Sequence, residues 1–170
     1  MPTDPPPDID AGVAGPSEAR LARLEARVRD LEDREAIRDL IAAYGPAADS
    51  GDCAAAAAAW AADGSYDIDG FGIVEGPAGI AAILEGAHHQ QLIAGGAAHV
   101  LSPLAITLSG DTATAVGYSC VFRHTGDGFE AHRVAANRST LVRADGQWRI
   151  ARRVNRLLNG AEAARALLRP

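Results

Sequence analysis

The chain of 170 residues is long enough for one domain with a substantial core and too short for two domains of ordinary size. Its formal net charge of −6 argues against a nucleic-acid partner, because phosphates would be repelled and no basic stripe offsets the repulsion. Hydrophobic residues make up 48% of the chain and aromatic residues only 5%, which favours helices with small side chains over a large aromatic binding face.

The cysteines and the N-terminus indicate where the protein works. Cys53 and Cys120 stand far apart without the spacing of a metal site, so we expect no disulfide framework. No apolar run approaches the ~20 residues that span a bilayer. The first residues, MPTDPPPDID, lack the basic start and apolar core of a signal peptide. We therefore expect a cytoplasmic protein without a membrane partner.

The N-terminal part divides into a tail and a helix. Residues 1–16 contain five prolines and few bulky apolar groups, so they bury too little surface to offset the entropy of ordering and are predicted to be a disordered tail. Ser17 is a candidate N-cap for a helix over 17–32. Its apolar residues recur every three or four positions, as in a short coiled-coil seam: Leu21, Leu24, Val28 and Leu31.

The apolar helical pattern continues as far as Tyr44. Pro46 is expected to kink or loosen the helix just before Asp49, because proline cannot donate the backbone hydrogen bond. The alanine-rich run 53–62 predicts a second helix, with Trp60 as its one bulky anchor.

The remainder of the chain changes from helical to β patterning. Short β-like segments at 65–68 and 71–74 precede a third helix, expected over 77–90 and opened by Gly76-Pro77. Long strands are then predicted, each separated from the next by a Gly/Asp turn of the hairpin type, over 98–108, 112–124, 129–143 and 147–157.

This order of elements predicts an α+β fold in which helices cover one face of an antiparallel meander. We expect three parts in the chain. A tail over 1–16 precedes an α+β domain over 17–157, whose first segment, 17–32, is a helical extension. Residues 158–170 form a C-terminal helix or tail, with a short helix near 160–168.

Six motifs follow one another along the chain: LEDREAIRDLIAAY, ADSGD, WAADGSYDIDGFGIVEGPAGI, AAHVLSPLAI, GDTATAVGYS and RADGQWRIARR. In this order they resemble the SnoaL-like branch of the nuclear transport factor 2-like superfamily. The resemblance covers residues 31–157 and implies a cone-shaped fold, in which N-terminal helices and a curved antiparallel or mixed sheet enclose a pocket. It implies less about the reaction, since the superfamily includes both enzymes and non-catalytic modules.

The resemblance also implies site residues. Relatives similar to scytalone dehydratase, bile-acid dehydratase and lindane dehydrochlorinase use an Asp after the first helix and a His that begins the first long strand. These positions correspond to Asp49 and His99. A Tyr five residues before the Asp is matched by Tyr44. An Arg on the last strand is matched by Arg153, and an Asn of scytalone dehydratase by Asn137.

Other positions extend or depart from that pattern. Trp60 and Tyr66 are further candidate substrate-binding residues, although Trp60 also fits a core anchor. Arg152 competes with Arg153 for the pocket, because a register shift of one residue reverses the face of a strand. Two tyrosines of scytalone dehydratase are replaced here by Ala48 and Ile68, which argues against that enzyme's particular substrate.

These residues together suit the removal of a proton beside a carbonyl or a leaving group. Histidine is a natural general base, since its ordinary pKa of ~6.5 lies near neutral pH. Asp49 would fix the tautomer of His99, Tyr44 would donate a hydrogen bond to a substrate oxygen, and Arg153 or Asn137 would stabilise negative charge. Neither an elimination nor a proton-shift isomerisation requires a metal or an organic cofactor, and we expect neither.

Each assignment has a structural alternative. Asp49 suits a turn or a helix end, and His99 suits an ordinary strand position. Tyr44 suits helix packing, and Arg153 suits a solvent-facing position.

The other histidines suggest no metal site. His88 and His89 lie near the end of the third predicted helix, where we expect both to be exposed. A site that combined them with His99, His124 or His132 would have none of the spacings of a compact zinc site. We therefore expect no bound metal.

Strand parity selects among the remaining polar candidates. His132 and Asn137 lie an odd number of residues apart, so they face opposite sides of an unbulged strand. Asn137 is the preferred pocket residue. Cys120 alternates with apolar neighbours and is expected in the core, as is Trp148.

Three functions remain open at this point. The first is a cofactor-independent lyase, proton-shift isomerase or cyclase acting on a small apolar, polycyclic or polyketide-like molecule. The second is a non-catalytic ligand-binding or oligomer-assembly module of the same fold, and the third is a partner subunit of a larger oxygenase. In each case we expect a homodimer or homotrimer, formed through the open sheet face and the seam between Leu21 and Leu31.

Overall fold

The computed structural model describes residues 15–169, so the tail predicted over 1–16 lies outside the described residues except for its last two positions. The chain divides into two compact units, with the boundary between Glu32 and Asp33. Within residues 15–169, no helix combines the length and the apolar character needed to cross a bilayer.

The first unit contains the start of helix α1 (Pro16–Ala42). The helix begins at Pro16, one residue earlier than predicted, because proline suits the first turn of a helix. The backbone N–H of Gly15 donates to Glu18 Oε2 at 2.9 Å, so Ser17 is not the N-cap. The seam residues Leu21, Leu24, Val28 and Leu31 are 47–64% exposed in the isolated chain.

The second unit begins with the last turns of α1, where Ile37 and Ile41 are buried. Helix α1 ends at Ala42, and α2 (Tyr44–Asp49) follows after the turn at Ala43. Pro46 has no N–H to donate to Ala42, which explains why the helix breaks here, as predicted.

The helix expected over 53–62 is shorter than predicted. Helix α3 (Cys53–Ala57) starts at the side chain of Asp52, which accepts from the N–H of Ala55 at 3.0 Å. It ends early because the chain joins the sheet: the N–H of Ile150 donates to the carbonyl of Ala59 at 2.8 Å, and Trp60 opens strand β1. Tertiary pairing has overridden the helix propensity of the alanines.

The third predicted helix and the first long strand are each divided in two. Gly86 adopts an extended conformation with ψ of 148° and separates α4 (Gly76–Glu85) from α5 (Ala87–Ala94). The chain around Pro103 leaves the sheet between β3 (Ala97–Leu101) and β4 (Ala105–Ser109), since proline cannot contribute a ladder hydrogen bond.

Within residues 15–169, seven strands form one mixed sheet in the order β2-β1-β7-β6-β5-β3, and β4 also pairs with β5. Strands β1 and β7 are parallel, and the other pairs are antiparallel. The remaining strands are β1 (Trp60–Ile68), β2 (Gly72–Glu75), β5 (Thr112–His124), β6 (Phe129–Ala144) and β7 (Gln147–Leu157). The predicted α+β class with a mixed sheet is confirmed.

The turns of the long hairpins lie where the Asp and Gly residues of the sequence predict them. At the β6–β7 turn, Asp145 and Gly146 have φ angles of 50° and 75°, which is the left-handed conformation that a tight hairpin requires. Asp and Gly adopt it readily, and this is why the predicted strand ends are almost right.

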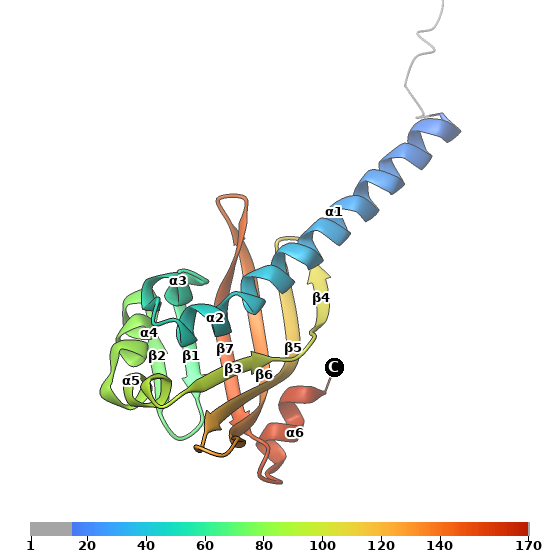
Figure 1. The fold of residues 1–170 in the computed structure, drawn as a ribbon. Helices are drawn as coiled ribbons and strands as arrows, with labels where there is room; N and C mark the ends of the chain where they lie inside the picture. The colour runs from blue at the N-terminus through green and yellow to red at the C-terminus, as the bar shows by residue number, and fades with distance from the viewer. Residues whose placement is uncertain (1–14, 170) are drawn as a thin grey trace, which may run out of the picture. The chain divides into compact units, whose positions relative to one another are not determined.

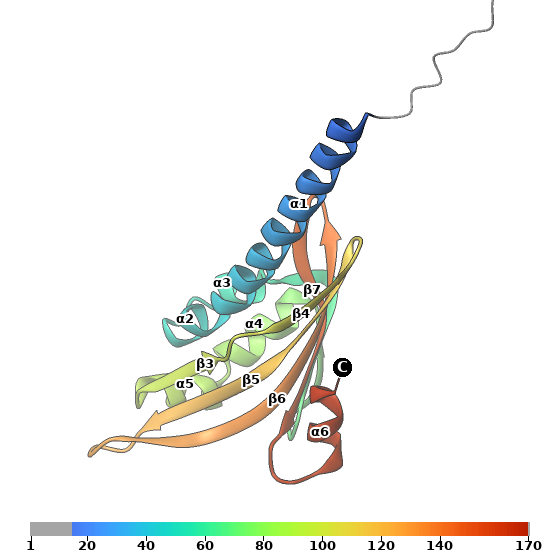
Figure 2. The ribbon, with the colours of Figure 1, turned by 90° about the vertical axis from the view of Figure 1, so that its right-hand side faces the viewer.

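The helices occupy both sides of the curved, unclosed sheet (Figures 1 and 2). Helices α2 to α5 cover one face, and α6 (Glu162–Leu168) packs against β6 and β7 from the other side. The core between the sheet and the first helices contains fully buried aliphatic residues: Ile37, Ile80, Leu141 and Ile150. The same layer holds the candidate site.

Candidate active site

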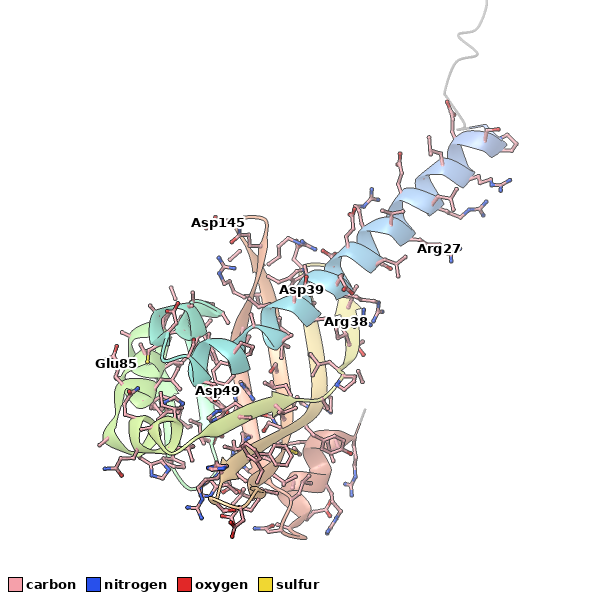
Figure 3. All side chains as sticks on the ribbon, in the orientation of Figure 1. Arg27, Arg38, Asp39, Asp49, Glu85 and Asp145 are labelled. Carbon is pink, nitrogen blue, oxygen red and sulfur yellow. The ribbon has the colours of Figure 1, made fainter. Side chains whose placement is uncertain are left out.

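The site depends on a close contact between α2 and β3. Asp49 is the last residue of α2 and His99 is the third residue of β3. Gly45 allows the two elements to approach, because a Cβ atom at this position would clash with the carbonyl oxygen of His99. Figure 3 shows Asp49 at the end of α2, beside β3.

Both oxygens of the Asp49 carboxylate bind His99. Oδ1 lies 2.5 Å from His99 Nδ1, and Oδ2 accepts from the backbone N–H of His99 at 2.7 Å. A carboxylate only accepts, so Nδ1 of a neutral His99 carries the proton and Nε2 has a free lone pair. The side chains of His99 and Asp49 are 15% and 24% exposed, so they are shielded from bulk water but not sealed off. The geometry suits a general base held in one tautomer.

Tyr44 lies next to this pair in a buried aromatic cluster. Its ring centroid is 5.6 Å from that of Trp60, which is itself 5.6 Å from that of Tyr66. Burial raises the pKa of the Tyr44 hydroxyl, and Tyr66 and Asp49 raise it further while Arg153 lowers it. The hydroxyl therefore stays protonated and is a hydrogen-bond donor at any physiological pH.

Tyr66 lines the cavity, whereas Trp60 does not. Trp60 is 2% exposed, and within the described residues its indole N–H has no hydrogen-bond partner. Its position does not support the expected role in substrate binding. It is a core anchor behind the two tyrosines.

Arg153 faces the interior and Arg152 the solvent, which resolves the register left open by the sequence. Arg153 is 3% exposed, and its guanidinium carbon lies 4.9 Å from the Tyr44 ring centroid and 4.8 Å from that of Tyr66. Such contacts partly stabilise the cation. The Arg152 side chain is 60% exposed and approaches Asp67 at 3.9 Å.

Asn137 holds the guanidinium group of Arg153 through a hydrogen bond. Its Oδ1 accepts from Arg153 Nε at 3.0 Å, and its Nδ2 donates to Ser119 Oγ at 2.8 Å. Asn137 is buried but does not line the cavity, so direct substrate binding by this residue is not what its position supports.

His132, which strand parity placed on the opposite face from the pocket, does line the cavity. The β5–β6 register shifts here, because Val121 pairs with Arg133 and Phe122 with Ala131, which leaves His132 as an extra residue. A β-bulge reverses parity along a strand. The prediction that His132 faces away from the pocket was therefore wrong, because nothing in the local sequence marks the bulge.

His89 lines the cavity as well, which its sequence context did not predict. It was expected to be exposed and is only 6% exposed, whereas His88 is exposed as predicted. Its ring centroid lies 5.3 Å from that of His99, and its Nδ1–H donates to the carbonyl of Leu84 at 2.9 Å. Within the described residues, Nε2 of His89 has no partner.

The break at Gly86 explains this error. In an unbroken helix His88 would follow Leu84 on the buried face, but the extended Gly86 redirects α5 and brings His89 inward instead. Burial lowers the pKa of His89, as does nearby His99, while the hydrogen bond to Leu84 and the charge of Asp49 raise it. The net shift is downward, so His89 is neutral near pH 7.

The cavity between helices and sheet has a volume of about 600 Å³. Most of its wall surface is apolar, and the aliphatic side chains that contribute to it include Ile68, Ile83, Leu92, Leu101 and Leu157. This size and character suit a small apolar molecule. Across residues 15–169, no group of three or more His, Cys, Asp or Glu side chains is arranged to hold a metal ion.

Comparison with known proteins identifies relatives of the whole fold. The profile of the SnoaL-like domain matches residues 29–154. An NTF2-like protein with a cystatin-like fold from Novosphingobium aromaticivorans is 49% identical, with a TM-score of 0.85, over 94% of this chain and 100% of that one. No curated protein gives a significant match.

More distant structures share the fold alone. Hexachlorocyclohexane dehydrochlorinase LinA-type3 from Novosphingobium barchaimii LL02 is 20% identical, with a TM-score of 0.67, over 78% of this chain and 90% of that one. A variant of Rv3472 from Mycobacterium tuberculosis, a protein of unknown function, is 23% identical, with a TM-score of 0.66, over 92% of each chain.

Proposed function

This chain belongs to the SnoaL-like domain family, and we propose that it is a cofactor-independent enzyme that removes a proton from a small apolar molecule. The reaction class is a dehydratase-like elimination, a proton-shift isomerisation or a cyclisation. The observation that carries the proposal is the 2.5 Å contact between Asp49 and His99 at the wall of an apolar cavity.

His99 acts as the general base. Its Nε2 takes the proton from a carbon beside a carbonyl group, and the resulting imidazolium is stabilised by the carboxylate of Asp49 through Nδ1–H. Because Asp49 also binds the backbone N–H of His99, it fixes the position of the residue as well as its tautomer.

Tyr44 and Arg153 stabilise the charge that develops when the proton leaves. The electrons of the broken C–H bond move towards the carbonyl oxygen, which becomes an enolate. Tyr44 donates a hydrogen bond to that oxygen, and Arg153, stacked on the same ring, supplies positive charge.

The same imidazolium completes either reaction. In an elimination, the enolate electrons expel a hydroxyl group, which takes the proton from His99 Nε2 and leaves as water. In an isomerisation, the proton returns to a different carbon. A dehydrochlorinase shares this fold, so the fold is compatible with elimination chemistry.

The experiment measures proton removal from a panel of model ketones. The protein is incubated in deuterium oxide with bicyclic ketones and β-hydroxy ketones, and mass spectrometry follows deuterium uptake and loss of water. His99→Gln should lower the rate at least ~100-fold, the usual contribution of a general base. His124→Gln is the control, because His124 is exposed and lies outside the cavity.

If His99→Gln exchanges deuterium as fast as the wild type, the general-base role is wrong. If no ketone exchanges with the wild type but the panel still binds, the chain is a ligand-binding module of the same fold instead.

A further inference from the structure

We propose that the ligand of this cavity carries an anionic oxygen group, a carboxylate or a phenolate, which binds between Arg153 and Arg133. The inference rests on the proposed function in one respect, that the cavity is the substrate site. It adds the chemical class of the substrate: an apolar ring system with one negative charge.

Arg153 is a buried cation without an anionic partner. At 3% exposure it has lost most of its hydration. Its hydrogen bond goes to the neutral amide oxygen of Asn137, and among residues 15–169 no carboxylate lies within 4.0 Å of its guanidinium nitrogens. Burying a charge is costly unless an opposite charge compensates it, so a ligand that supplies one is favoured.

Arg133 is a second cation in the cavity wall, and it too binds only neutral acceptors. Its Nη2 donates to the backbone carbonyl of Asp69 at 2.7 Å and to Asn155 Oδ1 at 2.8 Å. Its guanidinium carbon lies 5.8 Å from the Phe71 ring centroid. Within the described part of the chain, Arg133 also has no carboxylate within 4.0 Å.

Three carboxylates that flank or contact cavity-lining residues have hydrogen-bond partners. Both oxygens of Asp49 bind His99. Asp67 forms two short contacts with Arg156, at 2.7 and 2.8 Å. Asp69 Oδ2 accepts from the backbone N–H of Leu157 at 2.9 Å. Each of these three carboxylates has hydrogen-bond partners of its own, and none forms an ion pair with Arg133 or Arg153.

A polar network joins the two arginines across β6 and β7. Asn137 Oδ1 accepts from Arg153 Nε, and Asn155 Nδ2 donates to the same oxygen at 3.2 Å. Asn155 Oδ1 then accepts from Arg133. The amides use their acceptor oxygens to hold both guanidinium groups in place, so the arginines are fixed before a ligand arrives.

Charge and shape together define the ligand. Among the described residues that line the cavity, Arg133 and Arg153 contribute two permanent positive charges. The carboxylate of Asp49, behind His99, is already hydrogen-bonded. Most of the surface of the surrounding wall is apolar. A guanidinium group recognises a carboxylate or phenolate oxygen through charge-assisted hydrogen bonds, while the rest of the wall selects an apolar body.

The test compares two probes of almost equal shape, naphthoate and its neutral analogue naphthamide. Binding of each to the full-length protein is measured by isothermal titration calorimetry at pH 7. The wild type should bind naphthoate about tenfold or more tightly than naphthamide, as expected for a charge-assisted hydrogen bond. Arg133→Met should abolish most of this preference, because it weakens the binding of naphthoate far more than that of naphthamide.

Two controls make the result specific. Arg152→Met removes an adjacent, exposed arginine and should keep the preference. Arg133 is only partly buried, so its variant is expected to fold even if Arg153→Met does not. Equal affinity for the two probes, no measurable binding of naphthoate, or a preference that survives Arg133→Met would overturn the proposal.

Binding and proton exchange are separate readouts. His99→Gln should keep the preference for naphthoate while losing exchange activity. A wild type that prefers naphthoate but exchanges no ketone would contradict the proposed function and leave the anionic subsite standing.

Discussion

At the scale of single residues, the site combines groups that remain neutral with groups that remain charged. Burial raises the pKa of Tyr44 and lowers that of His89, so both residues are neutral near pH 7. Arg153 stays charged, as arginine does in proteins. His99 lines the same cavity, and because its Nδ1 is engaged by Asp49, the nitrogen available to a ligand is Nε2.

The lowered pKa of His89 predicts how stability changes with pH. Below the ordinary value of 6.5, the unfolded chain binds a proton at His89 while the folded protein stays neutral, until the pH falls through its lower folded pKa. In that window the unfolded state binds more protons, so the free energy of unfolding decreases as pH falls, by at most about 1.4 kcal/mol per pH unit.

Chemical denaturation from pH 7 to pH 5 measures this slope. His89→Gln should make it shallower, because the substituted side chain does not titrate. His124→Gln, at an exposed site, is the control and should leave the slope as it is. An identical slope in wild type and His89→Gln would show that His89 has no lowered pKa.

The site residues that could be predicted from the sequence are those tied to motifs with a fixed place in the fold. Asp49 and His99 follow from the resemblance to the SnoaL-like family, and they come together because α2 packs closely against β3. His89 could not be predicted without the break at Gly86, and His132 could not be predicted without the bulge. Both depend on tertiary pairing rather than on local sequence.

At the scale of elements, the contact between α2 and β3 brings Asp49 and His99 together. Helix propensity alone predicts that Gly45→Ala stabilises α2, by about 1 kcal/mol. Packing predicts the opposite, because the added methyl group would meet the backbone carbonyl of His99, which cannot rotate away. We expect packing to dominate, with a net loss of about 1–3 kcal/mol.

Gly79→Ala provides a matched control within α4. A Cβ atom there would lie 3.8 Å from Val74, an ordinary contact, so this variant should be neutral or slightly stabilising. The free energies of unfolding of both variants are measured by denaturant titration, alongside deuterium exchange of ketones. If Gly45→Ala is as stable and as active as Gly79→Ala, the close approach of α2 to β3 does not position the site.

The bounds of helices and strands were predictable where local residue types determine the backbone conformation. They were not predictable where pairing with a distant strand determines it. The β6–β7 hairpin follows from Asp145 and Gly146, whose left-handed φ angles those residue types allow. The alanines after Cys53 favour a helix, yet the chain beyond Ala57 enters the sheet because it pairs with β7. A run of alanines does not indicate in the sequence which strand the chain after it will pair with.

At the scale of the whole molecule, the order of the elements determined the fold class, since helices followed by a meander with short turns leave few arrangements. The oligomeric state is a prediction. The seam residues Leu21, Leu24, Val28 and Leu31, at 47–64% exposure, form an apolar stripe that a second copy could cover.

We expect the full-length protein to be a homodimer or homotrimer at micromolar concentration. Analytical ultracentrifugation of the wild type should give a mass of two or three chains of 17.6 kDa. The double variant Leu24→Glu, Leu31→Glu should weaken the association, because it places charge in the apolar stripe. A wild type that sediments as a monomer would contradict the prediction.

The tautomer of His99 is the most direct test of the central claim, that Asp49 holds a general base with Nε2 free. Imidazole ¹⁵N NMR spectra of the wild type and Asp49→Asn at pH 8 report which nitrogen carries the proton. We predict that His99 of the wild type is protonated at Nδ1, with a proton resonance shifted downfield that Asp49→Asn removes. A wild-type His99 protonated at Nε2, or a spectrum unchanged by Asp49→Asn, would contradict the account.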